Sequence, residues 1–540
     1  MLHPRLLACF CGVLCIFLLG AGCGGALAQA AEEDEEAAFT IVAFRIEGNT
    51  IFDDYTLLKE LLPFIGPDKK GTEVEAAAGA LEKFHQQQGY PAVLVNIPPQ
   101  TVDDGVIRLE VVESRIRKVR ITGNKYVTME KVLDQAPSLR EGEIPYLPDI
   151  KRDLASLNTS SYLAVEPVLA PGREPATIDV ELRVKDRLPL TASLELNNRY
   201  SANSTELRLN GSISYDNFWQ KDHSGSFQFQ VSPQDFDEVQ LLAGSYVLPT
   251  PWNRNHRIAA YAVWSDSQTA FAEGLQVVGK GHILGIRYIM PLPALERYSH
   301  NISLGVDYKS FRDVTGTGGQ DDIVEQVRYL PLNASYNSTL SDRWGRTAFS
   351  AGLNFAFRNL ASDTDHFGAQ RAGARGDYLY LTAGIERQQE LPWLLSVFCK
   401  LDGQLASQPL ISNEQYTAGG MDSVRGYLES EQSGDNALHG TVDLSGPELV
   451  GLMGKRFPDL DLFRDWSLTP YLFFDGAALW RKQPLPDEKR SVRIEGTGLG
   501  LRGNAGPVRY EADWAMAIED SIWTERGDDR FYFLLAYRHR

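Results

Sequence analysis

The chain has very little cysteine, and most of it lies at one end. Four of the five cysteines fall within the first 23 residues, so Cys399 is the only one in the rest of the chain. One cysteine forms no intramolecular disulfide and no zinc site of the usual cysteine-rich kind. The nine histidines include no His-Glu-x-x-His spacing, and neither a Gly-x-Ser-x-Gly elbow nor a complete phosphate loop is present. We therefore expect no enzyme, no catalytic residue, no metal and no cofactor.

Long hydrophobic runs are missing outside the N-terminus. Arg5 precedes an apolar run over residues 6–19, and Ala26, Ala28 and Ala30 offer small residues for cleavage, as in an export signal. We predict a signal peptide at residues 1–30. No later stretch approaches the roughly 18 apolar residues of a membrane helix. An exported chain without such helices is either soluble or a closed barrel, because lipid tolerates no other backbone.

A lipid anchor at Cys23 stays open as an alternative to a simple signal peptide. Gly20, Ala21 and Gly22 lead into this cysteine, as in weak lipidation motifs. The branched residue that usually stands three positions before the cysteine is missing.

Positive charge is also in deficit. The chain has 53 Lys and Arg against 71 Asp and Glu, for a net charge of −18. Nucleic-acid binding rewards clustered Lys and Arg, so we expect no nucleic-acid partner. What the chain has in quantity is glycine and aromatic residues, with 47 Gly, 24 Phe, 22 Tyr and 9 Trp. This composition favours a β-rich protein.

An internal repeat organises the first third of the chain. Residues 44–49 read Phe-Arg-Ile-Glu-Gly-Asn, and residues 119–124 read Val-Arg-Ile-Thr-Gly-Asn. Each copy continues with two helical patterns and ends in extended segments, which predicts the order β-α-α-β-β twice, over residues 40–114 and 115–187. The helices are expected at 56–62, 73–88, 128–136 and 149–157, and the closing strands at 106–112 and 177–184. Such sheets leave an edge that accepts an extended peptide, although two inert spacer domains fit the pattern equally.

From about residue 188 to the end, apolar and polar residues alternate. For example, Ile302, Leu304 and Val306 oppose Ser303 and Asp307. One apolar and one charged face, repeated, is typical of a membrane barrel with lipid outside and water inside. A soluble β-sandwich would not line its core with such charges. A membrane strand takes roughly 9–11 residues and its connections a similar length, so residues 188–540 hold about sixteen antiparallel strands. The longest polar connections, 359–377, 408–438 and 481–490, are candidates for closing the lumen.

Two short motifs resemble those of a known superfamily. Val424-Arg425-Gly426-Tyr427 lies in the longest connection, with Gly434-Asp435-Asn436 downstream, and Phe473-Phe474-Asp475-Gly476-Ala477 follows in a predicted strand. They are similar to the Val-Arg-Gly-Tyr loop and the Phe-x-Asp-x-Gly strand of the outer-membrane assembly factors and two-partner secretion transporters. The resemblance implies that the loop, between strands eleven and twelve, folds inward and that Arg425 pairs with Asp475, which shares a strand face with Phe473. Ala477 departs from the pattern, which has glycine there.

Further segments resemble the two-partner secretion transporters in particular, which export haemolysins and adhesins. They are Gly89-Tyr90, residues 97–100, Asp104-Gly105, residues 216–219 and residues 244–246. The resemblance implies two periplasmic POTRA domains, the small β-α-α-β-β domains of this family, followed by a barrel in the outer membrane of a Gram-negative cell. It implies translocation of a large unfolded exoprotein to the cell surface without ATP, with the cargo docking on POTRA sheet edges. The implied partners are that exoprotein, outer-membrane lipid and the barrel-assembly machinery that inserts the protein.

The resemblance has departures and rivals. Only residues 31–39 separate the signal from the first repeat, so the family's helical plug is expected to be absent, and residues 538–540 lack its terminal aromatic. An assembly or insertion factor for other barrels is the alternative function, and a general porin is a more distant one. Asp363, Asp365 and His366 could ligate calcium, but turn-forming polar residues are commoner there. Arg526-Gly527-Asp528 matches an integrin-binding tripeptide, but chance and ordinary turn chemistry explain it better.

Overall fold

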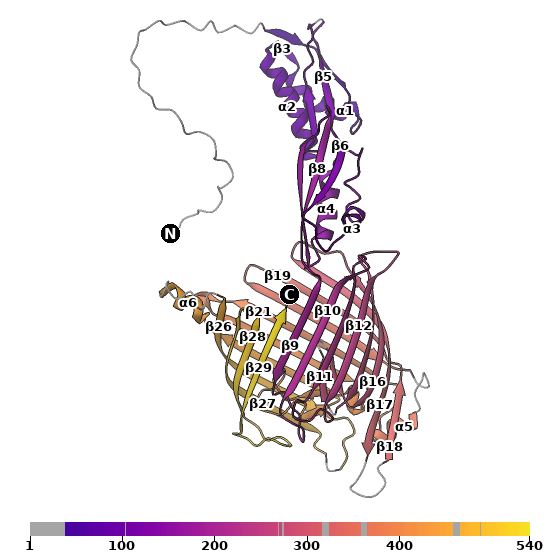
Figure 1. Ribbon diagram of the computed structural model, residues 1–540, viewed down its shortest axis with the longest axis vertical. Helices are drawn as coiled ribbons and strands as arrows, with labels where there is room; N and C mark the ends of the chain where they lie inside the picture. The colour runs from indigo at the N-terminus through magenta and orange to yellow at the C-terminus, as the bar shows by residue number, and fades with distance from the viewer. Residues whose placement is uncertain are drawn as a thin grey trace. The chain divides into compact units, whose positions relative to one another are not determined.

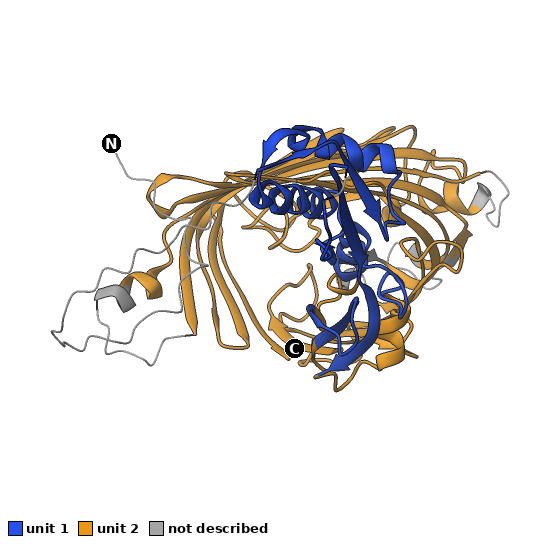
Figure 2. Cartoon of the chain, turned by 90° about the horizontal axis from the view of Figure 1, so that it is seen from above, with its two compact units in different colours: residues 1–122, 136–156, 166–183 blue, residues 123–135, 157–165, 184–540 orange. Residues whose placement is uncertain are grey.

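The computed structural model describes residues 38–539 except 103, 268, 273–274, 316–322, 358–363, 457–464 and 487. The chain divides into two compact units, one of residues 1–122, 136–156 and 166–183, and one of residues 123–135, 157–165 and 184–540 (Figure 2). No helix among the described residues is long and apolar enough to cross a membrane.

The first repeat folds as a three-stranded sheet with two helices. Its sheet has the order β2-β5-β4, with β2 (Ala43–Glu47) parallel to β5 (Val106–Glu113) and β4 (Val93–Asn96) antiparallel to it. The helices are α1 (Asp54–Leu61) and α2 (Gly71–Gln87), and a short pair, β1 (Phe39–Ile41) and β3 (Gly66–Lys69), adds a second sheet. Along α2, Val74, Ala77, Ala78 and Leu81 are buried, which is the i, i+3, i+4, i+7 stripe of an amphipathic helix.

The second repeat has the same three-stranded sheet and helix pair, without counterparts of β1 and β3 among the described residues. Its strands are β6 (Arg115–Thr122), β7 (Leu163–Pro171) and β8 (Thr177–Asp186), arranged as β6-β8-β7, and its helices are α3 (Met129–Asp134) and α4 (Leu147–Leu157). The predicted order β-α-α-β-β is therefore found in both repeats. The domain boundaries themselves stay a prediction.

The Gly-Asn pair of each repeat has a backbone explanation. Gly48 and Gly123 have φ of 83° and 85°, and a Cβ on either would lie 2.4 Å from a carbonyl oxygen, that of Val111 or Val184. Only glycine fits such a position without strain. The asparagine that follows stabilises the turn, since the side chain of Asn124 donates to the carbonyl of Val127 at 2.9 Å.

Residues 190–539 form a closed antiparallel barrel (Figure 1). Its strands are β9 (Leu190–Asn197), β10 (Arg208–Phe218), β11 (His223–Val231), β12 (Gln240–Pro249), β13 (Arg257–Asp266), β16 (Lys280–Pro291), β17 (Tyr298–Thr315), β18 (Ile323–Tyr329), β19 (Leu332–Asp342), β20 (Gly345–Phe355), β21 (Leu379–Glu390), β22 (Ser396–Ala406), β25 (Asn436–Ser445), β26 (Trp466–Trp480), β27 (Ser491–Ala505), β28 (Val508–Ala517) and β29 (Asp529–His539). Because β18 and β19 both pair with β17, they are two halves of one strand, and the barrel has sixteen. The seam joins β29 to β9, residues 534–539 against 192–197.

The two faces of the wall follow the predicted alternation. On β28, Trp514 is 42% exposed on the outer surface, whereas its neighbour Asp513 is fully buried on the lumen side. On β17, Leu304 faces outward and Asp307 is buried. The expectation of a sixteen-stranded transmembrane barrel with an apolar outer face is confirmed.

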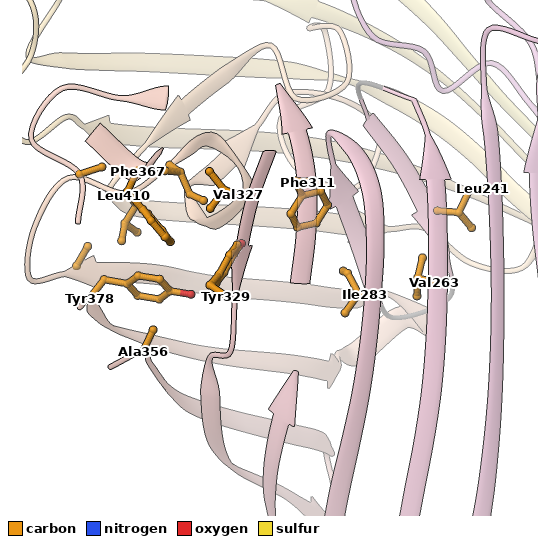
Figure 3. Packing of buried hydrophobic residues seen from close by; sticks show 13 residues of the cluster. Leu241, Val263, Ile283, Phe311, Val327, Tyr329, Ala356, Phe367, Tyr378 and Leu410 are labelled. Carbon is orange, nitrogen blue, oxygen red and sulfur yellow. The ribbon is translucent and has the colours of Figure 1, made fainter. Parts of the chain in front are cut away.

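Two of the connections predicted to close the lumen pack against its wall. Phe367, from α5 (Thr364–Gln370) in the β20–β21 connection, and Leu410, just after β22, lie in one buried cluster with the wall residues Phe311, Val327 and Tyr329 (Figure 3). The rings of Phe367 and Tyr329 meet edge to face at 5.4 Å. Apolar side chains inside this lumen are therefore covered by the connections themselves. The other short elements in the connections are β14 (Thr269–Ala272), β15 (Leu275–Val278) and α6 (Leu449–Arg456).

Candidate functional site

The long connection between β22 and β25, the eleventh and twelfth strands, forms a hairpin of its own. Its arms are β23 (Tyr416–Ala418) and β24 (Gln432–Gly434), which pair antiparallel. Residues 419–431 make the tip, hereafter the loop tip. Gly419, Gly420 and Gly426 have φ of 113°, 105° and 102°, and such angles favour glycine over any residue with a Cβ. These glycines let the tip turn sharply inside the barrel.

Arg425 of the loop tip is held by Asp475 on β26. Its Nε lies 2.7 Å from Asp475 Oδ2 and its Nη2 lies 2.8 Å from Oδ1, and its backbone N–H donates to Oδ2 at 3.1 Å. Both side chains are buried. Arginine can form this two-pronged arrangement and lysine cannot. The structure thus brings together the two residues that the family resemblance pairs.

Three further wall residues surround the same guanidinium. Asp443 on β25 accepts from Nη2 at 2.7 Å, and Asp513 on β28 lies 3.8 Å from Nη1. The ring of Phe473 lies 3.5 Å from the guanidinium carbon, a cation–π contact. Asp443 and Asp513 were missed by sequence reasoning, although both fall on the lumen face of alternating strands, which was the available signal.

A stripe of glycines on β27 makes room for the loop tip. Gly496, Gly498 and Gly500 occupy successive lumen-facing positions, because Leu499 and Leu501 face outward. A Cβ on Gly496 would lie 1.8 Å from the carbonyl oxygen of Arg425. The sequence does show this Gly-x-Gly-x-Gly spacing, which in a strand marks close approach of another backbone.

The other residues of the motif bury the tip against the wall. Val424 and Tyr427 are fully buried in a cluster that includes Ala477. Gly426 donates its N–H to the hydroxyl of Tyr532 at 3.0 Å, and that hydroxyl donates to the carbonyl of Tyr427 at 2.6 Å. The departure at Ala477 therefore adds a methyl group to the apolar surface that receives the motif.

The base of the loop is tied by a second buried carboxylate, Asp435. Both its oxygens accept from the guanidinium of Arg371, which follows α5, and they also accept the backbone N–H groups of Leu410 and Lys482 at 2.8 and 2.6 Å. Asp435 is fully buried. Three connections, those between β20 and β21, β22 and β25, and β26 and β27, thus meet at one carboxylate.

Glu414 anchors the same base to the opposite side of the lumen. Its carboxylate accepts from Lys309 Nζ and the Tyr329 hydroxyl, both at 2.6 Å, and from the Tyr380 hydroxyl at 2.8 Å. These donors come from three different strands. The loop is therefore fixed at its tip and at its base by separate carboxylates.

A cavity of about 660 Å³ remains in the lumen between this loop and the first strands. Its lining includes Glu195 on β9, Gln228 on β11, Lys400 on β22, and Asp422 and Glu429 on the loop tip. The lining carries both signs of charge and is largely polar.

The segment at 216–219, whose sequence resembles that of the secretion transporters, contributes Asn217 to a buried polar cluster around Lys131. Asn217 Oδ1 and Asp222 Oδ1 lie 2.6 and 2.5 Å from Nζ of Lys131, which the hydroxyl of Tyr162 also contacts at 2.8 Å. Lys131 is buried, and burial lowers its pKa while Asp222 partly offsets that shift. A buried lysine with a carboxylate and two polar partners ties residues 123–135 and 157–165 to the hairpin between β10 and β11. Sequence reasoning missed Lys131, because nothing in the sequence separates it from a surface lysine.

The POTRA sheet edges expected to take cargo are identifiable by topology. Within the described residues β2 and β4 are the outer strands of the first sheet, and β6 and β7 those of the second. Leu94 on β4 is 54% exposed. An outer strand offers unpaired backbone groups to an extended peptide.

The residues of the alternative calcium site and of the Arg-Gly-Asp tripeptide lie in two different connections of the barrel. Asp365 and His366 lie in α5, Asp363 falls outside the described residues, and residues 526–528 lie in the connection between β28 and β29. Among the described residues no group of three or more His, Cys, Asp or Glu side chains is placed to hold a metal ion.

The chain is similar to outer-membrane transporters in both sequence and fold. Residues 39–114 match the family model described as POTRA domain, ShlB-type, and residues 324–503 match that of the haemolysin secretion/activation protein ShlB/FhaC/HecB. The outer membrane transporter CdiB of Dickeya dadantii is 25% identical over 385 residues, which cover 68% of this chain and 64%, just under two thirds, of that protein. The transporter CdiB of Escherichia coli O6:K15:H31 is 23% identical over 445 residues, which cover 76% of this chain and 69% of that protein.

Solved structures agree on the fold. CdiB from Escherichia coli superposes with a TM-score of 0.62 at 18% identity, covering 95% of this chain and 93% of that one. BamA from Haemophilus ducreyi lacking POTRA domains 1–3 gives a TM-score of 0.55 at 16% identity, covering 93% and 100%. At these identities the likeness shows a shared architecture of POTRA domain and barrel.

Proposed function

We propose that this chain is a two-partner secretion transporter of the haemolysin secretion/activation type, and that it moves a large partner exoprotein from the periplasm to the cell surface. The barrel lies in the outer membrane, and the POTRA domains of this family are periplasmic. The observation that carries the proposal is the inward loop, which holds the motif of the family against the lumen wall through Arg425 and Asp475.

The cargo reaches the pore unfolded and docks first on a POTRA sheet edge. Backbone hydrogen bonds to an outer strand such as β4 supply affinity with little demand on the cargo sequence. The unfolded cargo then passes through the lumen beside the loop tip, and the loop tip shifts during this passage. Folding of the cargo outside the cell supplies the direction, and the transporter itself performs no enzymatic step. Lipid and the barrel-assembly machinery are the other partners, the latter for insertion of the barrel.

Secretion of a genetically adjacent large exoprotein tests this proposal. Cells would carry the wild-type transporter, the Arg425→Ala variant or no transporter, with Arg526→Ala as a control because this arginine is exposed in the last connection. We expect surface cargo to be absent without the transporter, reduced with Arg425→Ala and normal with Arg526→Ala. Normal secretion in the absence of the transporter would contradict the proposal.

An insertion factor for other barrels is the second candidate function. The observation that favours it is the likeness to BamA, whose fold this chain shares. The same strains distinguish the two functions, because loss of an insertion factor lowers the amounts of unrelated outer-membrane barrels, whereas loss of a secretion pore affects one exoprotein.

A further inference from the structure

The hairpin between β10 and β11 carries an unusual hydrogen-bonded group on the outer surface. Trp219 Nε1 donates to the hydroxyl of Tyr246 at 3.2 Å, and Nδ1 of His223 lies 2.7 Å from the same hydroxyl. Between Trp219 and His223 stands an exposed base, Lys221. The spacing along the chain is Trp-x-Lys-x-His.

The hairpin between β12 and β13 repeats this group. Trp252 Nε1 donates to the hydroxyl of Tyr288 at 3.1 Å, and Nδ1 of His256 lies 2.6 Å from that hydroxyl. The exposed base here is Arg254, so the spacing is Trp-x-Arg-x-His. The same chemistry therefore occurs twice, on alternate connections of the barrel.

The hydrogen bonds allow a tautomer in which Nδ1 of the imidazole accepts a proton from the tyrosine hydroxyl. An indole nitrogen is a donor only, so the tyrosine hydroxyl accepts from the tryptophan, and its own proton is available to Nδ1 of the histidine. In that tautomer the proton of the neutral imidazole is on Nε2, which becomes a donor. No hydrogen bond joins Nε2 of His223 or His256 to another described residue. Each hairpin thus presents an N–H donor beside a cation.

Both groups lie on the lipid-facing surface at the periplasmic ends of the strands. Tyr246 shares a strand face with Leu242, and Tyr288 shares one with Ile286, and both of these apolar residues are exposed on the outside. Since β9 follows the periplasmic repeats directly, the connections after β10 and β12 are on the periplasmic side. Trp219 is 74% exposed and Trp252 is 66% exposed. Indole rings favour the headgroup level of a membrane.

We propose that these two hairpins bind the phosphate groups of phospholipids in the periplasmic leaflet, with a preference for anionic headgroups. The imidazole Nε2–H and the base donate to the phosphate, and the indole lies at the acyl boundary beside it. Charge complementarity selects the lipid, because Lys221 and Arg254 attract a headgroup with net negative charge more than a zwitterionic one.

The next hairpin on the periplasmic side, between β16 and β17, has a similar histidine–tyrosine pair but not the free donor. His300 places Nδ1 3.1 Å from the hydroxyl of Tyr336, as in the two sites, but its Nε2 lies 3.3 Å from the carbonyl oxygen of Pro293. The donor that would meet a phosphate is already engaged there. The histidine–tyrosine pair alone therefore does not make a site, and the proposal is confined to the first two hairpins.

Native mass spectrometry of the full-length protein tests the proposal. The protein would be reconstituted in vesicles of equal phosphatidylglycerol and phosphatidylcholine, released in mild detergent, and scored for the number and ratio of retained lipids. The variant pair Lys221→Glu/Arg254→Glu reverses both bases. The control pair Lys489→Glu/Arg526→Glu makes the same change of charge on exposed bases at the opposite end of the barrel. Resistance of the unheated barrel to dodecyl sulfate verifies folding of each variant.

We expect the first pair to lower the ratio of phosphatidylglycerol to phosphatidylcholine by about fivefold for each base changed, and the control pair to leave it unchanged. The pair His223→Phe/His256→Phe keeps the charge and removes the donors, so it should lower retention of both lipids at an unchanged ratio. An equal fall in the control pair, or an unchanged ratio with Lys221→Glu/Arg254→Glu, would overturn the proposal.

Discussion

Replacing Gly496 by alanine should expel the loop tip without touching a charged residue. The Cβ of the new residue would lie 1.8 Å from the carbonyl oxygen of Arg425, and this distance must grow to about 3.4 Å, an ordinary contact. The obstacle is a backbone oxygen, so no change of rotamer relieves the overlap. Either β27 or the loop tip has to move, and β27 is held by hydrogen-bonded strands on both sides, β26 and β28.

The size of the effect follows from what the movement breaks. Overpacking alone costs about 1–3 kcal/mol. A retreat of the Arg425 backbone also pulls its guanidinium from Asp475, which it holds at 2.7 and 2.8 Å. Breaking a buried ion pair costs about 3–5 kcal/mol, because it leaves an uncompensated buried charge. We therefore expect Gly496→Ala to lower the free energy of unfolding by about 3–5 kcal/mol, which is more than packing strain alone would cause.

Urea unfolding of the barrel in lipid vesicles, followed by tryptophan fluorescence, measures this change. The decisive comparison is a double-mutant cycle with Arg425→Ala, since two changes that act through one interaction are not additive. In the Arg425→Ala background, Gly496→Ala should cost much less than in the wild type. Gly476→Ala on β26 is the matched control, because its nearest neighbour atom would be 3.6 Å from the new Cβ. Additive costs, or equal costs for Gly496→Ala and Gly476→Ala, would refute the reasoning.

Three other changes test the anchors around the site. Lys131→Met leaves Asp222 without its cation and should destabilise residues 123–135 by about 1–3 kcal/mol, seen as faster amide hydrogen exchange there. Arg371→Ala removes the guanidinium from the buried carboxylate of Asp435, at a cost of about 3–5 kcal/mol, and should raise pore conductance in planar bilayers as the connections separate. Burial would raise the pKa of Asp186, but three backbone N–H donors hold it below its usual range. Its stabilising effect is therefore present above the unfolded pKa of about 3.9 and is lost as pH falls through the lower folded value, so the protection of amides 125–127 should fall in acid, and less so in Asp186→Asn.

Two of these changes have a control variant at an exposed residue of the same type. Lys125→Met changes an exposed lysine close to Lys131, and Arg526→Ala changes an exposed arginine in the connection between β28 and β29. Equal hydrogen exchange in the two lysine variants, or equal conductance in the two arginine variants, would argue against the buried contacts as the cause. For Asp186, pH-independent protection in the wild type would do the same.

The architecture was predictable because its signals are local. Period-two alternation over residues 188–540 leads to a barrel whichever way the strands pair, and β9 begins at Leu190. The helices of the repeats follow 3.6-residue patterning, and the helix expected at 149–157 is observed at Leu147–Leu157. Boundaries move by a residue or two because caps and not periodicity decide them, as where the Asp53 side chain accepts from the Thr56 N–H before α1.

The surroundings of the site were less predictable, because they depend on strand register. The pairing of Arg425 with Asp475 was expected only from the family resemblance, since the two residues are 50 positions apart. Asp443 and Asp513 join them through strand pairing and loop placement that no local pattern encodes. A lumen-facing aspartate in an alternating strand has the same sequence signature whether it meets water or a guanidinium.

The placement of the anchors bears on where a translocating chain would pass. The loop tip contacts the wall formed by β25, β26, β27 and β28, through Asp443, Asp475, Gly496 and Asp513. Asp435 and Glu414 fix the loop base independently. Full withdrawal of the loop would therefore leave several buried carboxylates uncompensated, each at a cost of several kcal/mol. The cavity lies on the other side of the loop, toward β9 and β11, with a polar lining that meets an unfolded polypeptide at little cost. A path between the loop and these first strands meets the ion pairs of Arg199 with Asp422 and Glu429, but it leaves the anchors at Asp475, Asp435 and Glu414 in place. We therefore expect cargo crosslinks at Gln228 to exceed those at Asp443.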